Sequence, residues 1–543
     1  MRVPPGVSSE DFSAALQQFE EAVGKEWVFT SDEDLAMYRD AYSPFWGEPD
    51  ELVASAAVAS DGVEQVQKVV RIANAHKIPI YPISTGKNLG YGGSAPVYSG
   101  SVVLDLKRMN RIIEVNERNA CCLVEPGVSY FDLYRYIQEK GIKLWVDVPD
   151  PGWGSPVGNS LDRGGGYLLK QFRNHFDSHC GMEVVLANGE VIRTGMGALP
   201  GSQTWQQYKS GFGPWIDGIF SQSNFGVVTK MGFWMLPAPD SYLVGTVTVP
   251  HYNDLIPLID ILGYLENTGC TNGMPFFGSP LLARGPLGEG GPVPDAELTA
   301  LLDRDQGPDP DAMDAYAAKK GIPHWNCTVS FYGGPKANQG NWEFAQEKFS
   351  AIPGAKFSFG GAYKLPLAPD VQAKFNLPEF GIPSLQMFSI GARSDTNPTP
   401  GNGHIWFSPI IPRTGEAVFE ANWVFRQAAK ELGLPFPPFS LPTCYWERAF
   451  IFLFGFPITH DVETNKKNRA AFKRLVAMAA EHGWGEYRTA PAYQAAVMNT
   501  YSFNNHALLH LHETLKDAVD PNGILSAGRY GIWPKHLREG AQA

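Results

Sequence analysis

The chain has 543 residues, which exceeds what a single hydrophobic core accommodates and predicts two or more domains. A hydrophobic fraction of 44% and a charged fraction of 18% are typical of a soluble globular protein. The net charge of −12 argues against a nucleic-acid partner and against an anionic membrane surface.

The N-terminal segment, residues 1–7 (MRVPPGV), contains no apolar core of a signal peptide. The longest apolar stretch, residues 449–456, is too short to span a bilayer and is predicted to form one buried strand. The six cysteines show no C-x-x-C spacing, so we expect neither a metal site nor a disulfide framework. These features together predict a cytoplasmic protein with reduced thiols.

A glycine-rich loop at residues 82–93 is the first candidate ligand site. Residues 65–76 before it are apolar at helical spacing, and residues 78–82 and 101–106 are short strands on either side of the loop. The loop reads PISTGKNLGYGG, and its four glycines permit positive φ and leave no Cβ in the way of a ligand. Successive N–H groups in such a loop suit phosphate oxygens. The spacing is neither a P-loop nor G-x-G-x-x-G, so an ordinary surface turn is an equal alternative here.

A second glycine-rich run occupies residues 149–167. Glycine and proline recur in it too often for a helix or strand interior, so we predict loop and turn near a ligand. A strand pair at 110–127 and a helix at 130–140 come before it. A hairpin with an Asn-Gly turn at 182–194 and a third glycine-containing turn at 221–232 follow it.

The composition changes near residues 236–240, where we place a domain boundary. Beyond it the pattern predicts a strand at 243–249 and a long loop at 278–310 that contains a short helix near residues 294–303. Helical periodicity marks residues 253–265, 341–350, 416–432, 464–483 and 507–520, the last being followed by a Pro-Asn-Gly stop.

Four separated motifs carry a resemblance to a known family. They are the loop at 82–93, the run at 149–167, the tetrad EYRT at 486–489 and the segment DPNGI at 520–524. In this order they resemble the vanillyl-alcohol oxidase and p-cresol methylhydroxylase family of flavoproteins, with the closest likeness to eugenol oxidase. The resemblance covers nearly the whole chain and is weakest between residues 278 and 388.

The resemblance implies an α+β fold with a two-subdomain FAD-binding domain of the p-cresol methylhydroxylase type. That domain would cover residues 1–240. An α+β cap domain carrying an antiparallel sheet would cover residues 241–500, and a C-terminal segment, 501–543, would return to the FAD-binding domain. The expected partners are a small phenolic substrate and dioxygen, and the expected assembly is a homodimer or a higher homo-oligomer.

The resemblance also implies FAD as the cofactor. The first glycine-rich loop would cradle its pyrophosphate through backbone N–H groups. The expected FAD-binding residues are Ser84, Thr85, Gly86, Lys87, Asn88, Leu89, Gly90, Gly93, Gly154, Ser155, Gly158, Asn159, Gly226, Val228 and Arg529. Arg529 matches a basic position at the flavin N1–C2 edge. His404 matches the histidine that binds the flavin covalently in eugenol oxidase; a half-buried strand histidine is the alternative.

Four residues match the catalytic set of the family. Tyr91, Tyr487 and Arg488 match residues that bind a phenolate, and Asp150 matches a carboxylate near the substrate α-carbon. A guanidinium and two hydroxyl donors favour the anion of a phenol, whose ordinary pKa is about 10. Asp150 would serve as a base. Taken singly, Arg488 is as consistent with a surface ion pair, and Asp150 with a Pro-Asp-Pro-Gly turn.

One segment departs from the family pattern, because Leu168 to His175 replace a shorter Thr-Pro-Tyr-Gly-Asp-His sequence. The implied function is an FAD-dependent oxidase of para-alkylphenols and 4-hydroxybenzyl-type alcohols. It would proceed by hydride transfer through a para-quinone methide, with dioxygen reduced to hydrogen peroxide. A dehydrogenase that passes electrons to a cytochrome or another acceptor is the first alternative, and a non-catalytic flavin-binding protein is the second. Histidine at 404 and the absence of an export signal favour the oxidase.

Overall fold

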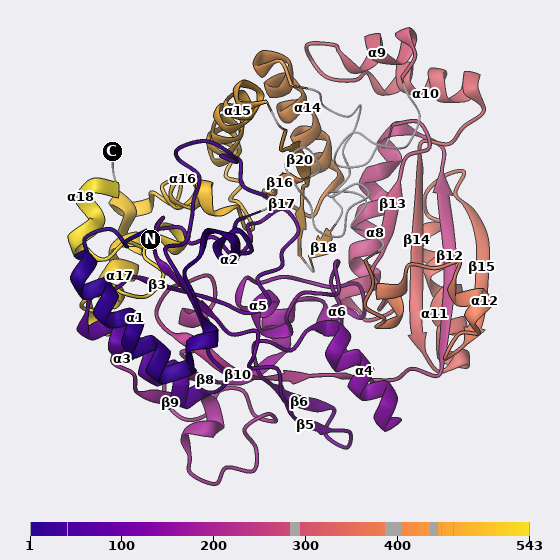
Figure 1. The fold of residues 1–543 in the computed structure, drawn as a ribbon. Coiled ribbons are helices and arrows are strands. Elements are labelled where there is room, and N and C mark those ends of the chain that lie inside the picture. The colour runs from indigo at the N-terminus through magenta and orange to yellow at the C-terminus, as the bar shows by residue number, and fades with distance from the viewer. Residues whose placement is uncertain are drawn as a thin grey trace.

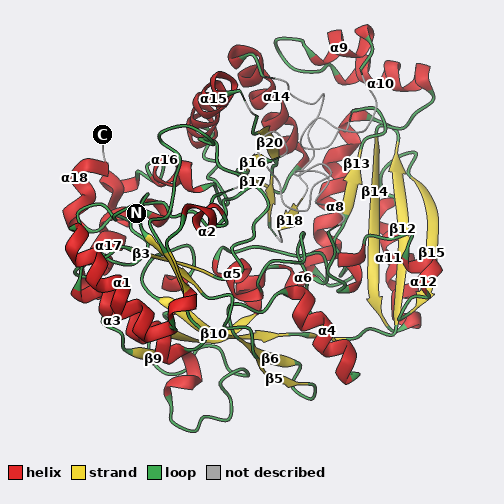
Figure 2. Ribbon diagram, in the orientation of Figure 1, coloured by secondary structure: helices red, strands yellow, loops and turns green. Residues whose placement is uncertain are grey.

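The computed structural model describes residues 2–40, 42–282, 294–385, 403–434, 444–446, 448–459 and 461–541 (Figure 1). Within them the protein has an α+β fold built on several separate sheets, as the sequence predicts. Figure 2 shows a large antiparallel sheet on one side of the molecule and the remaining sheets nearer the two termini.

The first sheet has the strand order β1-β2-β4-β3 and carries the first glycine-rich loop. Its strands are β1 (Val28–Phe29), β2 (Ala57–Ala59), β3 (Ile80–Ile83) and β4 (Val102–Asp105). Strands β2, β4 and β3 are parallel, and helix α3 (Val63–Ala75) makes the crossover that parallel strands require. Helices α1 (Ser9–Val23) and α3 bury their apolar faces in the same core. The loop therefore begins at the carboxyl end of β3.

The second sheet is antiparallel, with the order β5-β6-β10-β8-β9. Its strands are β5 (Ile112–Asn116), β6 (Cys121–Val124), β8 (His179–Val185), β9 (Val191–Arg193) and β10 (Val227–Trp234). Helix α4 (Tyr130–Lys140) packs its buried face into this core and ends at Gly141 in the left-handed conformation. Strands β7 (Leu144–Trp145) and β11 (Leu236–Pro237) pair in a separate two-stranded sheet.

The second glycine-rich run is not loop throughout, contrary to the prediction. It contains helix α5 (Pro156–Leu161). The Ser155 side chain accepts a hydrogen bond from the Gly158 N–H, and Pro156 occupies the first helical turn, where a missing N–H costs nothing. Counting prolines alone therefore missed a helix start. Short helices α6 (Lys170–Arg173) and α7 (His175–Ser178) follow, in the segment that departs from the family pattern.

The third sheet is antiparallel, with the order β13-β14-β12-β15, and stands on the right in Figures 1 and 2. Its strands are β12 (Ser241–Val249), β13 (Phe276–Gly278), β14 (Trp325–Gly333) and β15 (Lys356–Lys364). Helices α8 (Leu255–Asn267) and α11 (Pro335–Phe349) bury Leu258, Leu262 and Trp342 in one core with its inner face. Further helices in this part are α9 (Ala296–Leu302), α10 (Pro310–Lys320) and α12 (Pro369–Gln372).

The apolar stretch at 449–456 forms two strands rather than the single strand predicted. Strand β19 (Ala449–Ile451) pairs with β17 (Ile410–Pro412) and β18 (Cys444–Trp446), whereas β20 (Phe454–Pro457) pairs with β16 (His404–Phe407). In a continuously apolar run, apolar and polar residues do not alternate, so the sequence gives no sign of the point where the chain leaves one sheet and enters another. Helices α14 (Gly415–Leu432) and α15 (Val462–Glu481) pack into the core that these strands share.

The C-terminal part of the chain packs against the first sheet. The Ile80 N–H donates to the Ile524 carbonyl (2.7 Å), and the Ser526 N–H donates to the Ile80 carbonyl (2.8 Å). In Figure 1 the yellow C-terminal helices accordingly lie beside the indigo N-terminal segment. The remaining helices are α2 (Asp32–Ala36), α16 (Gln494–Met498), α17 (Phe503–Val519) and α18 (Arg538–Ala541).

Candidate active site

A cavity of about 380 Å³ lies where the glycine-rich segments meet. The chain segments that line it come from the first sheet, the second sheet, strand β16, residues 487–488 and the C-terminal part. The predicted site residues that line it are Ser84, Gly86, Lys87, Asn88, Leu89, Tyr91, Gly93, Asp150, Gly154, Ser155, Gly158, Asn159, Gly226, Val228, Tyr487, Arg488 and Arg529. Thr85, Gly90 and His404 are not among its lining residues. The folding of the chain thus gathers residues that lie more than four hundred positions apart.

Two glycines that line the cavity have no room for a side chain: Gly158, where the two glycine-rich runs approach each other, and Gly86, which is confined by the residue after its own loop. A Cβ at Gly158 would lie 2.2 Å from Ser84 Oγ, and a Cβ at Gly86, where φ is +65°, would lie 2.3 Å from Ser94 Oγ. Bare backbone therefore faces the cavity on both sides. Such a cradle suits a long ligand whose phosphate groups accept backbone N–H bonds, and Lys87 adds a cation to it.

His404 lies directly behind the cavity wall. Its side chain is fully buried, and its Nε2 would be 2.7 Å from a Cβ at Gly90, which adopts φ +82°. The imidazole packs against Trp406, with ring centres 4.1 Å apart, and against Tyr42, at 5.7 Å. Trp406 itself lines the cavity. Glycine at position 90 therefore brings the histidine ring next to the loop that follows β3.

Tyr91, Tyr487 and Arg488 meet at one end of the cavity. The Arg488 guanidinium carbon lies 4.0 Å from the Tyr91 ring centre and 5.1 Å from that of Tyr487, and the two rings are edge to face at 6.1 Å. The Tyr487 hydroxyl donates to the Arg163 carbonyl (2.7 Å). Burial lowers the pKa of Arg488, but Tyr487, Tyr91 and Asp162 outweigh it and hold that pKa above its ordinary value. The site thus keeps a permanent positive charge beside two phenol rings.

Asp162 is a site residue that the sequence reasoning missed. Its Oδ1 accepts from Arg529 Nη2 (2.6 Å) and from the Tyr530 hydroxyl (2.8 Å), and Arg529 also donates to the Tyr81 hydroxyl. Burial raises the pKa of Asp162, but Arg529 and Arg488 outweigh burial and lower it below the ordinary value. The only feature of the sequence that could have pointed to Asp162 as a site residue was its charge inside a glycine-rich run. Arg529 therefore enters the cavity as half of an ion pair.

Asp150 is half-buried at the cavity wall, and its loop is held by residues 383–384. Burial raises the pKa of its carboxyl to about 7, although a hydrogen bond from Tyr167 works in the opposite direction. The Gly152 N–H donates to the Ser384 carbonyl (2.9 Å), and a Cβ at Gly152 would lie 2.5 Å from Pro383 Cβ. A carboxyl with a pKa near neutrality can exchange a proton at physiological pH.

The divergent segment ties the FAD-binding part of the chain to the third sheet. Leu168 and Leu169 share an apolar cluster with Tyr242 and Tyr332. Arg173, which lines the cavity, donates from Nη1 to Glu266 Oε1 of helix α8 (2.9 Å), and both side chains are buried.

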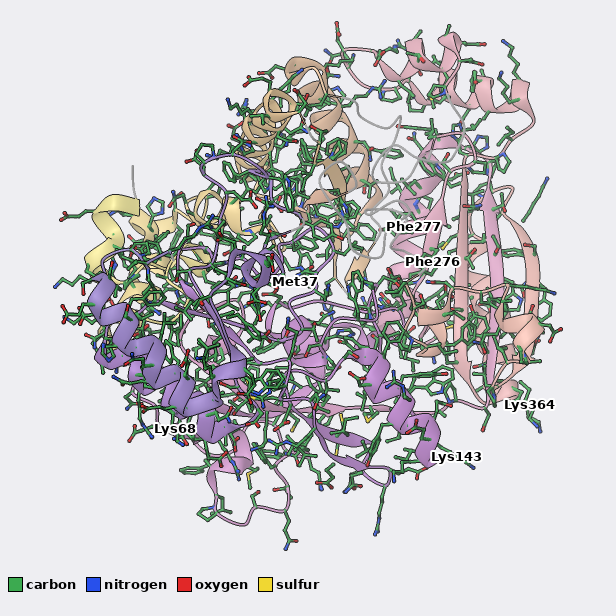
Figure 3. The ribbon with its side chains drawn as sticks, in the orientation of Figure 1. Met37, Lys68, Lys143, Phe276, Phe277 and Lys364 are labelled. Carbon is green, nitrogen blue, oxygen red and sulfur yellow. The ribbon has the colours of Figure 1, made fainter. Side chains whose placement is uncertain are left out.

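Two adjacent aromatic residues on the edge strand β13 lie outside the cavity. Phe276 and Phe277 lie side by side there (Figure 3) and are not among the cavity-lining residues. Phe277 instead packs on Phe450, with ring centres 5.5 Å apart.

The fold and the cradle define an FAD-binding protein, since the family model described as "FAD binding domain" matches residues 54–195. The chain is 35% identical to the 4-cresol dehydrogenase [hydroxylating] flavoprotein subunit of Pseudomonas putida, over 98% of this chain and 97% of the relative. Its structure matches p-cresol methylhydroxylase with substrate bound at a TM-score of 0.80 and 32% identity, over 98% and 99% of the two chains.

The structure of 4-ethylphenol oxidase from Gulosibacter chungangensis, in complex with isoeugenol, matches at a TM-score of 0.79 and 32% identity, over 99% and 100% of the two chains. The chain belongs to the vanillyl-alcohol oxidase and p-cresol methylhydroxylase family of FAD-dependent oxidoreductases. Across the described parts of the chain, no helix is long and apolar enough to cross a membrane. The same residues contain no group of three or more His, Cys, Asp or Glu side chains that could hold a metal ion.

Proposed function

We propose that the protein is an oxidase of para-substituted phenols, with para-alkylphenols and 4-hydroxybenzyl-type alcohols as substrates. The observation that carries the proposal is the placement of Arg488 against the rings of Tyr91 and Tyr487 in a cavity that Asp150 also lines. The names of these relatives point the same way, because p-cresol and 4-ethylphenol both carry an alkyl group para to a hydroxyl.

The residues of the site would act on the two ends of such a substrate. Arg488 favours ionisation of the phenol, and the Tyr91 hydroxyl can donate a hydrogen bond to the resulting oxygen anion. The anion pushes electrons through the ring toward the para carbon, so the attached carbon loses a hydride and a para-quinone methide remains. FAD, when bound, would supply the acceptor for that hydride, and dioxygen would finally take the electrons to give hydrogen peroxide. Asp150 serves as the base for water attack or for loss of a product proton.

Two other functions remain as alternatives. A dehydrogenase that delivers electrons to a cytochrome or another acceptor is favoured by the name of the Pseudomonas relative, a "flavoprotein subunit" of a dehydrogenase. A non-catalytic flavin-binding protein would not need Tyr91, Asp150, Tyr487 and Arg488 around one cavity. We also propose the domain division at residues 240 and 500, a cytoplasmic location and a homo-oligomeric assembly.

Hydrogen peroxide formation tests the proposed function. With 4-ethylphenol and dissolved dioxygen, the purified protein should consume one dioxygen for each hydrogen peroxide formed. A dehydrogenase would instead reduce an added artificial acceptor quickly and dioxygen slowly. Bleaching of the flavin by 4-ethylphenol under anaerobic conditions separates both from a non-catalytic protein, which would keep its colour.

We propose that His404 is joined covalently to the flavin. Its buried imidazole next to Gly90 would place Nε2 at the loop that follows β3. Acid-precipitated protein should stay yellow, and its mass should exceed that of the polypeptide by one FAD. His404→Ala should release all of its colour to the supernatant, whereas His482→Ala, on the surface after α15, should behave as wild type. A colourless wild-type pellet would refute the attachment.

A further inference from the structure

Ser408 and Glu486 form a buried contact beside the cavity that the proposed chemistry does not use. Ser408 is fully buried directly after β16, and Glu486 is 8% exposed directly before Tyr487. The Ser408 N–H and Oγ donate to Glu486 Oε2 at 2.9 and 3.2 Å. Ser408 Oγ also lies 2.9 Å from the Arg488 carbonyl oxygen, and the Tyr487 N–H donates to the Ser408 carbonyl (2.9 Å).

This contact joins two parts of the site that are far apart in sequence. Strand β16 begins at His404, and Ser408 is the first residue after it. Residues 485–488 run beside the chain after β16, because the Ile410 N–H donates to the Gly485 carbonyl (2.8 Å) and Pro409 bridges to Glu486. The position of the Arg488 backbone relative to β16 therefore depends on Ser408 and on the carboxyl group that holds it.

We propose that Ser408 and Glu486 are positioning residues that fix Tyr487 and Arg488 relative to strand β16, and thereby set the affinity of the phenol-binding end of the cavity. The inference rests on the proposed function, since it deepens the account of how that same site is built. Neither side chain lines the cavity, so both act through the backbone of Arg488 and Tyr487.

The protonation state of Glu486 decides which acceptor the Ser408 hydroxyl serves. A hydroxyl has one proton, so Ser408 Oγ donates either to the Glu486 carboxyl or to the Arg488 carbonyl. Burial raises the pKa of Glu486 to about 8, against the hydrogen bonds from Ser408. At pH 7 the carboxyl is then mostly neutral, and a neutral carboxyl competes less strongly for that proton. The Arg488 carbonyl is therefore held best below pH 8.

The groups shown to interact with this carboxyl are Tyr501 and Ser408. The pKa of Tyr501 is raised by burial first and by Glu486 second, while Arg163 lowers it. The backbone N–H and hydroxyl of Ser408, which donate to Glu486, do not titrate. Because Tyr501 stays neutral below pH 10, a transition near pH 8 belongs to Glu486.

Variants of the full-length FAD-bound protein test the proposal. Glu486→Gln keeps the size and a neutral acceptor for the Ser408 N–H, Glu486→Leu leaves that buried N–H without its acceptor, and Ser408→Ala removes the hydroxyl that reaches the Arg488 carbonyl. Each variant is made in an Asp150→Asn background, and 4-ethylphenol is titrated anaerobically against the oxidised flavin. At pH 7 the dissociation constant should rise about tenfold in Glu486→Leu and Ser408→Ala. Glu486→Gln should stay within about threefold of its parent. Above pH 8 the parent should lose affinity relative to Glu486→Gln.

A control variant and a second measurement distinguish failure of the positioning role from failure of the proposed function. Glu347→Leu, an exposed change on α11, is the matched control and should change nothing. Amide hydrogen exchange of residues 485–490 should quicken in Glu486→Leu and Ser408→Ala but not in Glu486→Gln. If the parent binds no phenol but exchange changes in this way, the proposed function fails and the positioning role stands. If phenol binds and Glu486→Leu neither weakens binding nor quickens exchange, the positioning role is wrong.

Discussion

Replacing Arg488 with alanine is expected to lower kcat/KM for 4-ethylphenol by about 10²-fold or more. Its guanidinium lies 4.0 Å from the Tyr91 ring centre and is the permanent charge at the proposed phenol end of the cavity. A free phenol has a pKa of about 10 and is almost entirely neutral at pH 7. Without the charge, the site must bind the neutral form, whose ring releases a hydride less readily.

Steady-state kinetics and absorbance spectra check this expectation together. Wild-type protein should bind a phenolic inhibitor as its anion, seen as a red-shifted absorbance, and Arg488→Ala should bind it neutral. Arg488→Lys keeps the charge but not the planar fork, so it should fall between the two. Arg474→Ala removes an exposed arginine on α15 and should leave both readouts unchanged. Neutral binding in the wild type with a mild effect of Arg488→Ala would place the phenol elsewhere.

The glycine-rich loop could be located from the sequence because its constraint is local. Gly86 and Gly90 both need positive φ, and a Cβ at either would collide with a neighbour. Glycine spacing after a β-branched strand carries that information in consecutive residues. Gly158 was instead expected from the family resemblance, and its neighbour in the structure is Ser84 of the other run. Positions that require glycine for local backbone geometry can therefore be predicted from the sequence without knowledge of the fold.

Contacts between segments that are distant in the sequence could not be predicted from it. Nothing near Asp162 in the sequence indicates that Arg529 would lie 2.6 Å from it, because the pair forms only when the C-terminal part packs on the first sheet. The Ser408 contact with Glu486 has the same origin, since two chain segments meet beside β16. Pairing partners of this kind follow from the topology of the fold, and the residues of a single sequence do not reveal which of them meet.

The depth of a residue was also misjudged where the pattern was ambiguous. The alternative for His404 was a half-buried strand histidine, yet it is fully buried because β16 is covered on both faces, as its four-residue run of buried positions shows. For Asp150 the tetrapeptide Pro-Asp-Pro-Gly indicated a turn, and its backbone is a loop held by Ser384. Asp150 can both form part of a turn and act as a base, so only an experiment on its carboxylate shows whether the side chain takes part in the reaction.

Asp150→Asn is expected to slow flavin reduction by 4-ethylphenol by at least about 10²-fold, with substrate binding little changed. Positive charge develops at the α-carbon as the hydride leaves, and a nearby anion stabilises it. Asparagine has the same shape but no charge, and it cannot accept the proton that water releases. Pro149 and Pro151 restrict the backbone on both sides, so the loop should keep its conformation.

The pH dependence gives this prediction its sign. Because burial raises the pKa of Asp150 to about 7, the charged form predominates above pH 7 and is lost below it. The wild-type kcat/KM, which reports the free enzyme, should therefore fall as the pH drops through about 7. In Asp150→Asn this acid limb should disappear, while any limb that arises from the phenol or from Glu486 remains.

Rapid mixing under anaerobic conditions measures the rate of flavin bleaching directly and so separates reduction from reoxidation. The FAD content of each variant must be matched first, because a carboxylate beside the cofactor can also affect how much flavin is incorporated. Asp260→Asn on α8, an exposed position, supplies a control in which only a surface charge is lost. If Asp150→Asn reduces its flavin at nearly the wild-type rate and keeps the acid limb, the raised pKa reflects burial alone, and Asp150 serves only the conformation of its loop.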